Sequence, residues 1–194
     1  MKINTLLITT LVSTSIALAS EANTTAPAEI TVKQEGMKYI KMLGGALKGE
    51  LQTHMKADKT GLAAMSFCTA QADSITKEIN AKLPKYASVR RTAMKTRNPN
   101  NAADVLDIKI MKEYEASIAA KTFLPADIKV VVEGETTRVY KPLVTKGVCL
   151  KCHGTDVSKE IQSEIKTHYP KDQALGFKEG SLRGMIVAEI KKKP

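Results

Sequence analysis

Hydrophobic residues recur at steps of three and four positions along the first two thirds of the chain. This spacing predicts an amphipathic helix over residues 32–55 and a second helix over residues 62–83, which ends before Pro84. A third helix is expected over residues 102–121, after a turn-forming sequence that begins at Asn98. The apolar stripe of the second and most regular helix consists of Leu62, Met65, Cys68, Ala72, Ile75, Ile79 and Leu83.

The pattern changes from helix to strand in the last third of the chain. Residues 128–133 and 136–144 are rich in β-branched residues and are joined by a Glu-Gly-Glu turn, which predicts a hairpin. Residues 182–190 form a third predicted strand, and a short helix ending at Tyr169 is expected before it. Long helices followed by antiparallel strands indicate an α+β fold.

The N-terminal segment has the pattern of a secretory signal peptide. Lys2 is followed by an uncharged, largely apolar stretch that ends in the small-x-small sequence Ala-Leu-Ala at residues 17–19. We therefore expect a signal peptide at residues 1–19 and export of the mature chain to the periplasm. An uncleaved membrane anchor is the alternative, and contact with a membrane is expected only in that case.

The composition fits one globular domain. The 194 residues are 43% hydrophobic and 26% charged, and a single core typically serves about 100–200 residues. Residues 20–34 are small and polar, which predicts a flexible lead, and the domain is expected over residues 35–191. The net charge is +10, but dispersed basic residues in an exported chain argue against a nucleic-acid partner.

One short motif carries distinctive chemistry. Residues 149–153 read C-x-x-C-H, the motif for covalent attachment of c-type haem. In such a site the thiols of Cys149 and Cys152 add to the two vinyl groups of one porphyrin, and His153 is then held beside the iron as an axial ligand. Because c-type attachment takes place outside the cytoplasmic membrane, the predicted signal peptide agrees with this interpretation.

Three other interpretations of the cysteine pair are weaker. A zinc site needs four Cys or His ligands, and the remaining candidates Cys68, His54 and His168 are not paired at a short spacing. A thiol–disulfide oxidoreductase of the thioredoxin type carries its pair within a βαβ unit, whereas the preceding strand here belongs to a hairpin. A structural disulfide is compatible with an exported chain.

The spacing of residues leaves the second axial position of the iron open. A lone Cys on an apolar helical stripe, such as Cys68, is more often a small buried hydrophobe than a ligand. His54 faces inward on the first predicted helix, and His168 follows His153 closely in the sequence. Methionine is a common ligand in electron-carrying cytochromes. The candidates of this type are Met37, Met42, Met55, Met65, Met94, Met111 and Met185.

Several blocks of sequence resemble a known family when they are taken together. In chain order they are residues 91–102 (RTAMKTRNPNNA), 140–143 (YKPL), 149–154 (CLKCHG), 169–176 (YPKDQALG) and 180–184 (GSLRG). They resemble the single-haem c-type cytochrome domain with a PAS-like fold, which also occurs as the extracytoplasmic sensor part of signalling receptors. The chain departs from the family pattern at Ala93, where Ser is expected, and at Ala103, where Pro is expected.

This resemblance implies a PAS-like antiparallel sheet flanked by long N-terminal helices, with one haem c bound through an attachment loop. It also implies that Cys68 binds the iron opposite His153, because relatives carry a Cys ligand on the matching helix. Arg91 or Arg97 is then a candidate to bind the haem propionates, since a guanidinium group binds a carboxylate through two hydrogen bonds.

Two classes of function follow from these expectations. The first is a haem protein that senses redox state or a small ligand and signals to a separate periplasmic redox or signalling protein. The alternative is a periplasmic electron-transfer cytochrome, and enzymatic activity is not expected. Thiolate ligation stabilises ferric iron and makes a poor relay to high-potential acceptors. The sensing function is therefore the preferred prediction.

Overall fold

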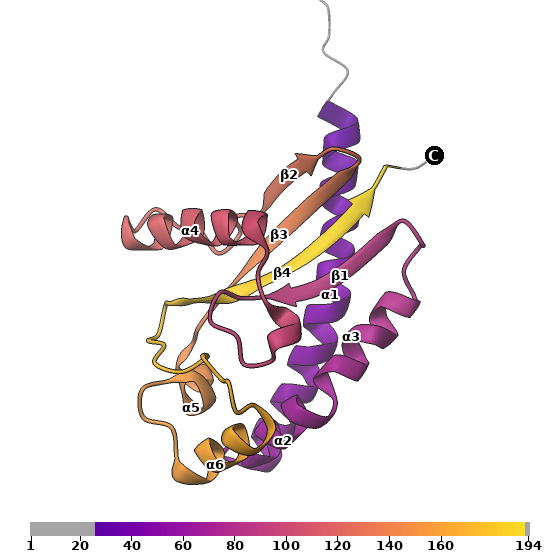
Figure 1. The fold of residues 1–194 in the computed structure, drawn as a ribbon. Helices are drawn as coiled ribbons and strands as arrows, with labels where there is room; N and C mark the ends of the chain where they lie inside the picture. The colour runs from indigo at the N-terminus through magenta and orange to yellow at the C-terminus, as the bar shows by residue number, and fades with distance from the viewer. Residues whose placement is uncertain (1–25, 193–194) are drawn as a thin grey trace, which may run out of the picture.

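The computed structural model describes residues 26–192, which form an α+β fold around one antiparallel sheet (Figure 1). The helices and strands are α1 (Ala26–Ala57), α2 (Leu62–Ala70), α3 (Ala72–Ala81), β1 (Ala87–Thr92), α4 (Val105–Ala119), β2 (Lys129–Glu133), β3 (Thr136–Val144), α5 (Leu150–His153), α6 (Lys159–His168) and β4 (Leu182–Lys191). Short 3₁₀ turns at Pro99–Asn101 and Gly147–Cys149 precede α4 and α5.

The sheet has the strand order β1-β4-β3-β2, and every pair of neighbouring strands is antiparallel. The last strand in the chain, β4, therefore lies between β1 and β3 at the centre of the sheet. Ala188 of β4 pairs with Val89 on one side and with Val139 on the other. Successive β4 side chains point to opposite faces. Because both faces are covered, most β4 residues are buried.

Helices α1 and α4 cover opposite faces of the sheet, as Figure 1 shows. On the α1 face, Ile40 and Leu43 pack against Ile186 in a buried cluster. On the α4 face, Met111 and Tyr114 pack against residues that include Val187. The alternation of β4 side chains between these two clusters makes β4 the link between both halves of the core.

A glycine brings α1 close to the sheet. A Cβ atom placed on Gly36 would lie 2.5 Å from the Cγ2 atom of Val139, so no larger residue fits without movement. Gly45, one of three further glycines in the same helix, has no neighbour within 4 Å of such a Cβ atom. The close approach at Gly36 thus fixes the position of α1 on β3, whereas Gly45 only weakens the helix.

A third apolar cluster lies beyond the sheet, where α2 meets α6. Met65 of α2 packs there against Val157, Ile161 and Ile165, and all four side chains are buried. Cys152 is packed against the same cluster. Figure 1 shows α2, α5 and α6 together at the lower end of the molecule. This cluster therefore places the helix that carries Cys68 beside the C-x-x-C-H segment.

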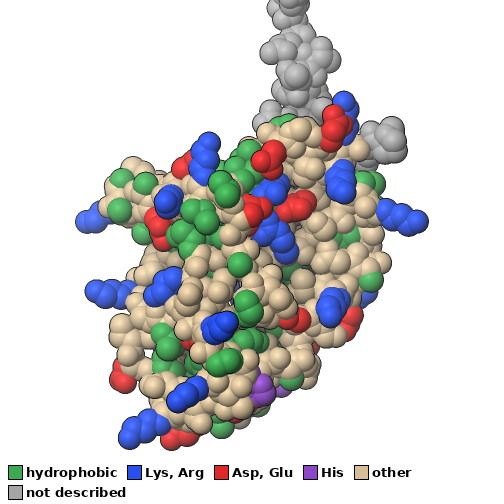
Figure 2. Space-filling model, in the orientation of Figure 1, with side chains coloured by type: hydrophobic (Ala, Val, Ile, Leu, Met, Phe, Trp, Pro, Cys, Tyr) green, Lys and Arg blue, Asp and Glu red, His purple; other side chains and the backbone are tan. Residues whose placement is uncertain are grey.

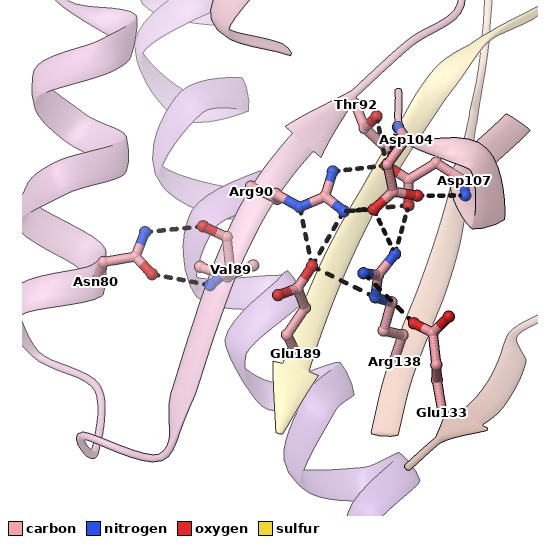
Figure 3. A network of polar contacts seen from close by, with 9 residues as sticks. All are labelled: Asn80, Val89, Arg90, Thr92, Asp104, Asp107, Glu133, Arg138 and Glu189. Atoms are coloured by element: carbon pink, nitrogen blue, oxygen red, sulfur yellow. Dashed lines mark hydrogen bonds and ion pairs between the residues drawn. The ribbon is translucent and has the colours of Figure 1, made fainter. Parts of the chain in front are cut away.

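A network of charged side chains joins the start of α4 to all four strands (Figure 3). Arg90 donates two hydrogen bonds to the fully buried carboxylate of Asp107, at 2.7 and 3.1 Å. Its Nε atom donates to Glu189 of β4 at 3.0 Å. Burial opposes ionisation of Asp104, but the Asp107 backbone N–H and Arg138 outweigh it and lower the pKa of Asp104. The network fixes the N-terminal end of α4 on the sheet.

The three strands predicted from the sequence are present within one residue of the expected bounds. The third predicted helix is present as α4, which begins three residues later and ends two residues earlier than expected. Three expectations are corrected. The flexible lead predicted over residues 20–34 is helical from Ala26 onward, since α1 begins there. The helix predicted over residues 62–83 is two helices that meet at Gln71. Strand β1, which the sequence did not predict, forms the edge of the sheet beside β4.

The predicted signal peptide at residues 1–19 lies outside the described residues. Within residues 26–192, no helix combines the length and the apolar character needed to cross a membrane. Lys and Arg side chains are spread over the face shown in Figure 2 and do not gather in one patch.

Candidate functional site

The C-x-x-C-H segment is held in a compact turn. Cys149 ends a 3₁₀ turn, and Cys152 and His153 lie on the short helix α5 that follows it. Gly154 comes next, and a Cβ atom on it would lie 2.5 Å from the Leu150 carbonyl oxygen, so the tight exit requires glycine. All three cysteines of the described chain are free thiols. Two of them are thus presented close together on one turn.

His153 is oriented and kept neutral by its surroundings. Its Nδ1 atom lies 2.8 Å from the carbonyl oxygen of Ala174, so Nδ1–H donates this hydrogen bond and Nε2 keeps its lone pair. Burial, followed by the positive charges of Arg183 and Arg97, lowers the pKa of His153 to about 3. A neutral imidazole whose other nitrogen is held by a carbonyl group is the usual form of a metal-binding histidine.

Cys68 of α2 shares its surroundings with the C-x-x-C-H segment. Burial raises the pKa of the Cys68 thiol, and the next contribution comes from Cys152. The positive charges of Arg91 and Arg97 act in the opposite direction. Met65 of the same helix and Cys152 also pack in one apolar cluster, so the structure brings the helix of Cys68 to the C-x-x-C-H segment, although 84 positions separate Cys68 from Cys152 in the sequence.

The other histidines make contacts that do not involve the motif. The ring of His54 is stacked on Phe67, with 5.1 Å between the ring centroids. The Nε2 atom of His168 lies 3.2 Å from a carboxylate oxygen of Glu164, one helical turn earlier in α6. Within the described residues, these contacts connect neither His54 nor His168 to the C-x-x-C-H segment.

Arg97 holds two parts of the site together. Its Nη2 atom donates to the carbonyl oxygen of Cys152 at 2.6 Å, and its Nε atom donates to Asp172 at 3.2 Å. Both members of the Arg97–Asp172 pair are almost entirely buried. Arg97 therefore fastens α5 to the segment that contains Asp172 and Ala174. The sequence predicted Arg97 as a partner of haem propionates, and that role remains a prediction.

Arg91, the other predicted propionate partner, forms one ion pair. Its Nη2 atom donates to Asp73 of α3 at 3.0 Å. Its Nε atom is buried and has no hydrogen-bond partner. A buried N–H group without a partner lowers the stability of the protein. The Nε–H group of Arg91 is therefore suited to donate a hydrogen bond to an anion.

Sequence reasoning assigned no role to Arg183, which also lies at the site. Arg183 is the second residue of β4, and its guanidinium carbon lies 5.3 Å from the centroid of the Phe177 ring. The Phe177 ring in turn meets the His153 ring edge-on, at 6.2 Å between centroids. The only sequence signal was its place in the block GSLRG, which gives no indication of a contact with a residue near His153.

The donor set fits a covalently bound haem. Two free thiols stand on one turn beside a neutral imidazole with an available Nε2, and a third thiol lies nearby on another helix. The orphaned Nε atoms of Arg91 and Arg183 provide donors for carboxylates. Thioether attachment, axial ligation and propionate binding each have a chemically suited group in this set.

Comparison with known proteins gives two matches. A family model described as Tll0287-like matches residues 5–190. The fold is similar to the crystal structure of the cyanobacterial haem protein Tll0287, with a TM-score of 0.59 and 24% sequence identity. That similarity covers 89% of this chain and 98% of the other chain. No curated protein matches the sequence.

Proposed function

Because the chain belongs to the Tll0287-like family, we propose that it binds one haem covalently through Cys149 and Cys152, with His153 as an axial ligand. The observation that carries this proposal is the state of His153. Its Nδ1–H group is held by Ala174, and its ring is neutral and buried directly after two free thiols. The match to a solved haem protein supports the same conclusion.

Cys68 is the proposed second axial ligand. It is the third free cysteine, and its helix α2 packs against the cluster that includes Cys152, which supports this role. Burial raises the pKa of the Cys68 thiol, and the positive charges of Arg91 and Arg97 partly oppose this shift. A bound iron would itself favour the thiolate, which is the form that binds a metal. His54 and His168 are engaged elsewhere, which supports Cys68 over both.

The proposed activity is sensing of redox state or of a small ligand. A bound haem supplies an iron that changes oxidation state and binds diatomic molecules. Cys68 lies on a short helix of nine residues that meets α3 at a bend at Gln71. This helix can therefore shift without a matching movement of the sheet. Loss of the Cys68 ligand on reduction would leave α2 with two positions for a partner to distinguish.

The proposal includes export to the periplasm, with residues 1–19 as the signal peptide. The C-x-x-C-H motif supports it, because c-type haem is attached outside the cytoplasm. Mass spectrometry of the protein purified from the periplasm tests this point. A mature N-terminus near Ser20 is expected, and an intact N-terminus in a membrane fraction would favour the anchor instead.

The main experiment is co-expression with c-type maturation machinery. The wild-type protein is expected to retain haem in a denaturing gel, since thioether bonds survive denaturation. The double variant Cys149→Ala, Cys152→Ala is expected to lose all covalent haem. Cys68→Ala is the matched control, because it removes a thiol of the same site without removing an attachment point. Covalent haem in the double variant would refute the proposal.

A spectroscopic experiment separates sensing from electron transfer. The ferric wild-type protein is expected to be low-spin with a thiolate ligand, and Cys68→Ala is expected to admit added cyanide. The ferrous wild-type protein is expected to bind carbon monoxide. A ferrous protein that stays six-coordinate and refuses carbon monoxide would favour the electron-transfer cytochrome, and a spectrum altered by His54→Ala instead would transfer the ligand role to His54.

A further inference from the structure

Arg183 is a cation whose hydrogen-bonding capacity is only partly used. Its Nη1 atom donates to the carbonyl oxygen of Lys95 at 3.0 Å. Its Nε atom is buried and has no hydrogen-bond partner. Within residues 26–192, no carboxylate forms an ion pair with Arg183. A half-buried guanidinium group with an unpaired charge and an unused N–H donor lowers the stability of the protein unless an anion binds to it.

The carboxylate that affects Arg183 is already engaged with another arginine. Asp172, whose charge affects Arg183, is bound by Arg97 at 3.2 Å, and the neighbouring cation Arg91 has its own partner in Asp73 at 3.0 Å. Burial lowers the pKa of Arg183 to about 10, and the next contribution is repulsion from Arg97, with a smaller one from Arg91. The three arginines therefore leave an excess of positive charge that the protein itself does not neutralise.

This charge lies close to the C-x-x-C-H segment. The Arg183 guanidinium lies over one face of Phe177, and the edge of Phe177 contacts the His153 ring. Lys95 also lies over the Phe177 ring, with its Nζ atom 4.9 Å from the centroid. Cys149 is among the groups whose charge affects Arg183. These contacts place Arg183 one aromatic ring away from His153, so a group bound at the C-x-x-C-H segment is the nearest source of an anion for it.

We propose that Arg183 binds a propionate carboxylate of the haem through its Nε–H group, with the free Nε–H of Arg91 as a further donor to the propionates. This inference rests on the proposed haem binding. It assigns the propionate contact to the two arginines with unused buried donors. Arg97, whose guanidinium group already binds Asp172 and the Cys152 carbonyl, acts instead as a positioning residue for α5.

The competing explanation is that Arg183 has only a packing role, through Phe177 and the Lys95 carbonyl. The two explanations predict different effects of Arg183→Gln on the haem-free and haem-loaded protein. A packing residue stabilises both forms. A propionate partner stabilises only the loaded form, because its unpaired charge is unfavourable when no anion is present.

The test compares Arg183→Gln with the wild-type full-length chain, each with and without attached haem. In urea unfolding, the haem-free variant is expected to be at least as stable as haem-free wild type, whereas the loaded variant is expected to unfold at a lower urea concentration than loaded wild type. Resonance Raman bands of the propionate groups are expected to shift in Arg183→Gln. Arg183→Lys, which keeps the charge, is expected to restore part of the loaded stability.

Lys112→Gln is the matched control, because it removes the same charge from the exposed surface of α4. It is expected to leave the propionate bands unchanged. The proposal is overturned if Arg183→Gln destabilises both forms alike or leaves the propionate bands of the loaded protein as in wild type. A wild-type protein that carries no covalent haem would instead refute the proposed function itself, before any variant is compared.

Discussion

At the scale of single residues, the contact between Arg90 and Asp107 is the clearest determinant of stability. Asp107 is fully buried, and it accepts two hydrogen bonds from Arg90 and one from the hydroxyl group of Thr92. Asp107→Asn keeps the size of the side chain but removes its charge. The variant is expected to lower the free energy of unfolding by about 2–3 kcal/mol, as for other hydrogen bonds to charged groups. Urea denaturation measures the change.

The control for this prediction is Glu115→Gln, on the exposed side of the same helix. It removes one negative charge from α4 without touching the network, so a change of less than about 0.5 kcal/mol is expected. Equal effects of the two variants would show that the charge on α4, and not the buried pair, determines the stability.

Asp58 stabilises the start of α2, the helix that carries Cys68. Its carboxylate accepts hydrogen bonds from the Thr60 hydroxyl group and from the backbone N–H groups of Thr60 and Ala63. The Thr60 hydroxyl group, then the Ala63 N–H group, lower the pKa of Asp58 from 3.8 to about 2. The contribution of a carboxylate with a lowered pKa is present above pH 3.8 and is lost as the pH falls toward 2.

Asp58→Ala is therefore expected to lower the unfolding midpoint at pH 7 and to have a progressively smaller effect below pH 4. Urea titrations across this pH range, with the exposed Asp156→Ala as control, measure the difference. A destabilisation that is the same at pH 7 and pH 2.5 would mean that the side chain acts by packing and not by its charge.

At the scale of elements, α1 offers a matched pair of glycines. Gly36→Ala places a Cβ atom against Val139 and is expected to lower the free energy of unfolding by about 1–3 kcal/mol through overpacking. Gly45→Ala, in the same helix but with open space around it, is expected to raise that free energy by about 0.5–1 kcal/mol. Thermal denaturation of both variants measures these opposite changes in stability. A Gly36→Ala variant as stable as wild type would contradict the close packing of α1 on β3.

Some elements could be predicted from the sequence because their hydrophobic pattern is local. Strand β3 has the bounds expected from its β-branched run at residues 136–144. Strand β1 could not be predicted because Arg90 and Arg91 interrupt the apolar pattern of this six-residue segment. The charge of Arg90 is balanced by Glu189, 99 positions away, and no local pattern reports such a contact.

The same limit applies to the helices and to the candidate site. The bend at Gln71 contains no glycine or proline. The Gln71 N–H group donates to the Phe67 carbonyl, and the Gln71 carbonyl accepts from the Ile75 N–H group. The hydrophobic spacing therefore continues through the bend unchanged. The C-x-x-C-H motif was visible because its chemistry lies in five consecutive residues. The placement of Arg183 next to Phe177 depends on the folded chain.

At the scale of the whole molecule, haem attachment is expected to stabilise one end more than the other. The small cluster around Met65 holds α2 to α6, whereas the sheet is covered by larger clusters on both faces. Hydrogen exchange in α2, α5 and α6 is expected to slow by about tenfold or more on loading. Exchange in the centre of β3 and β4 is expected to change little. Equal slowing of both regions would contradict this division of the molecule.

The central position of β4 has a consequence for the order of events during biosynthesis. The ribosome makes β4 after every other described element, yet β1 and β3 pair only through it. The nascent chain therefore cannot close its sheet until residues 182–191 have emerged, and the cysteine pair at residues 149–152 precedes them. An attachment enzyme that acts on the emerging chain would meet these thiols before the fold encloses them.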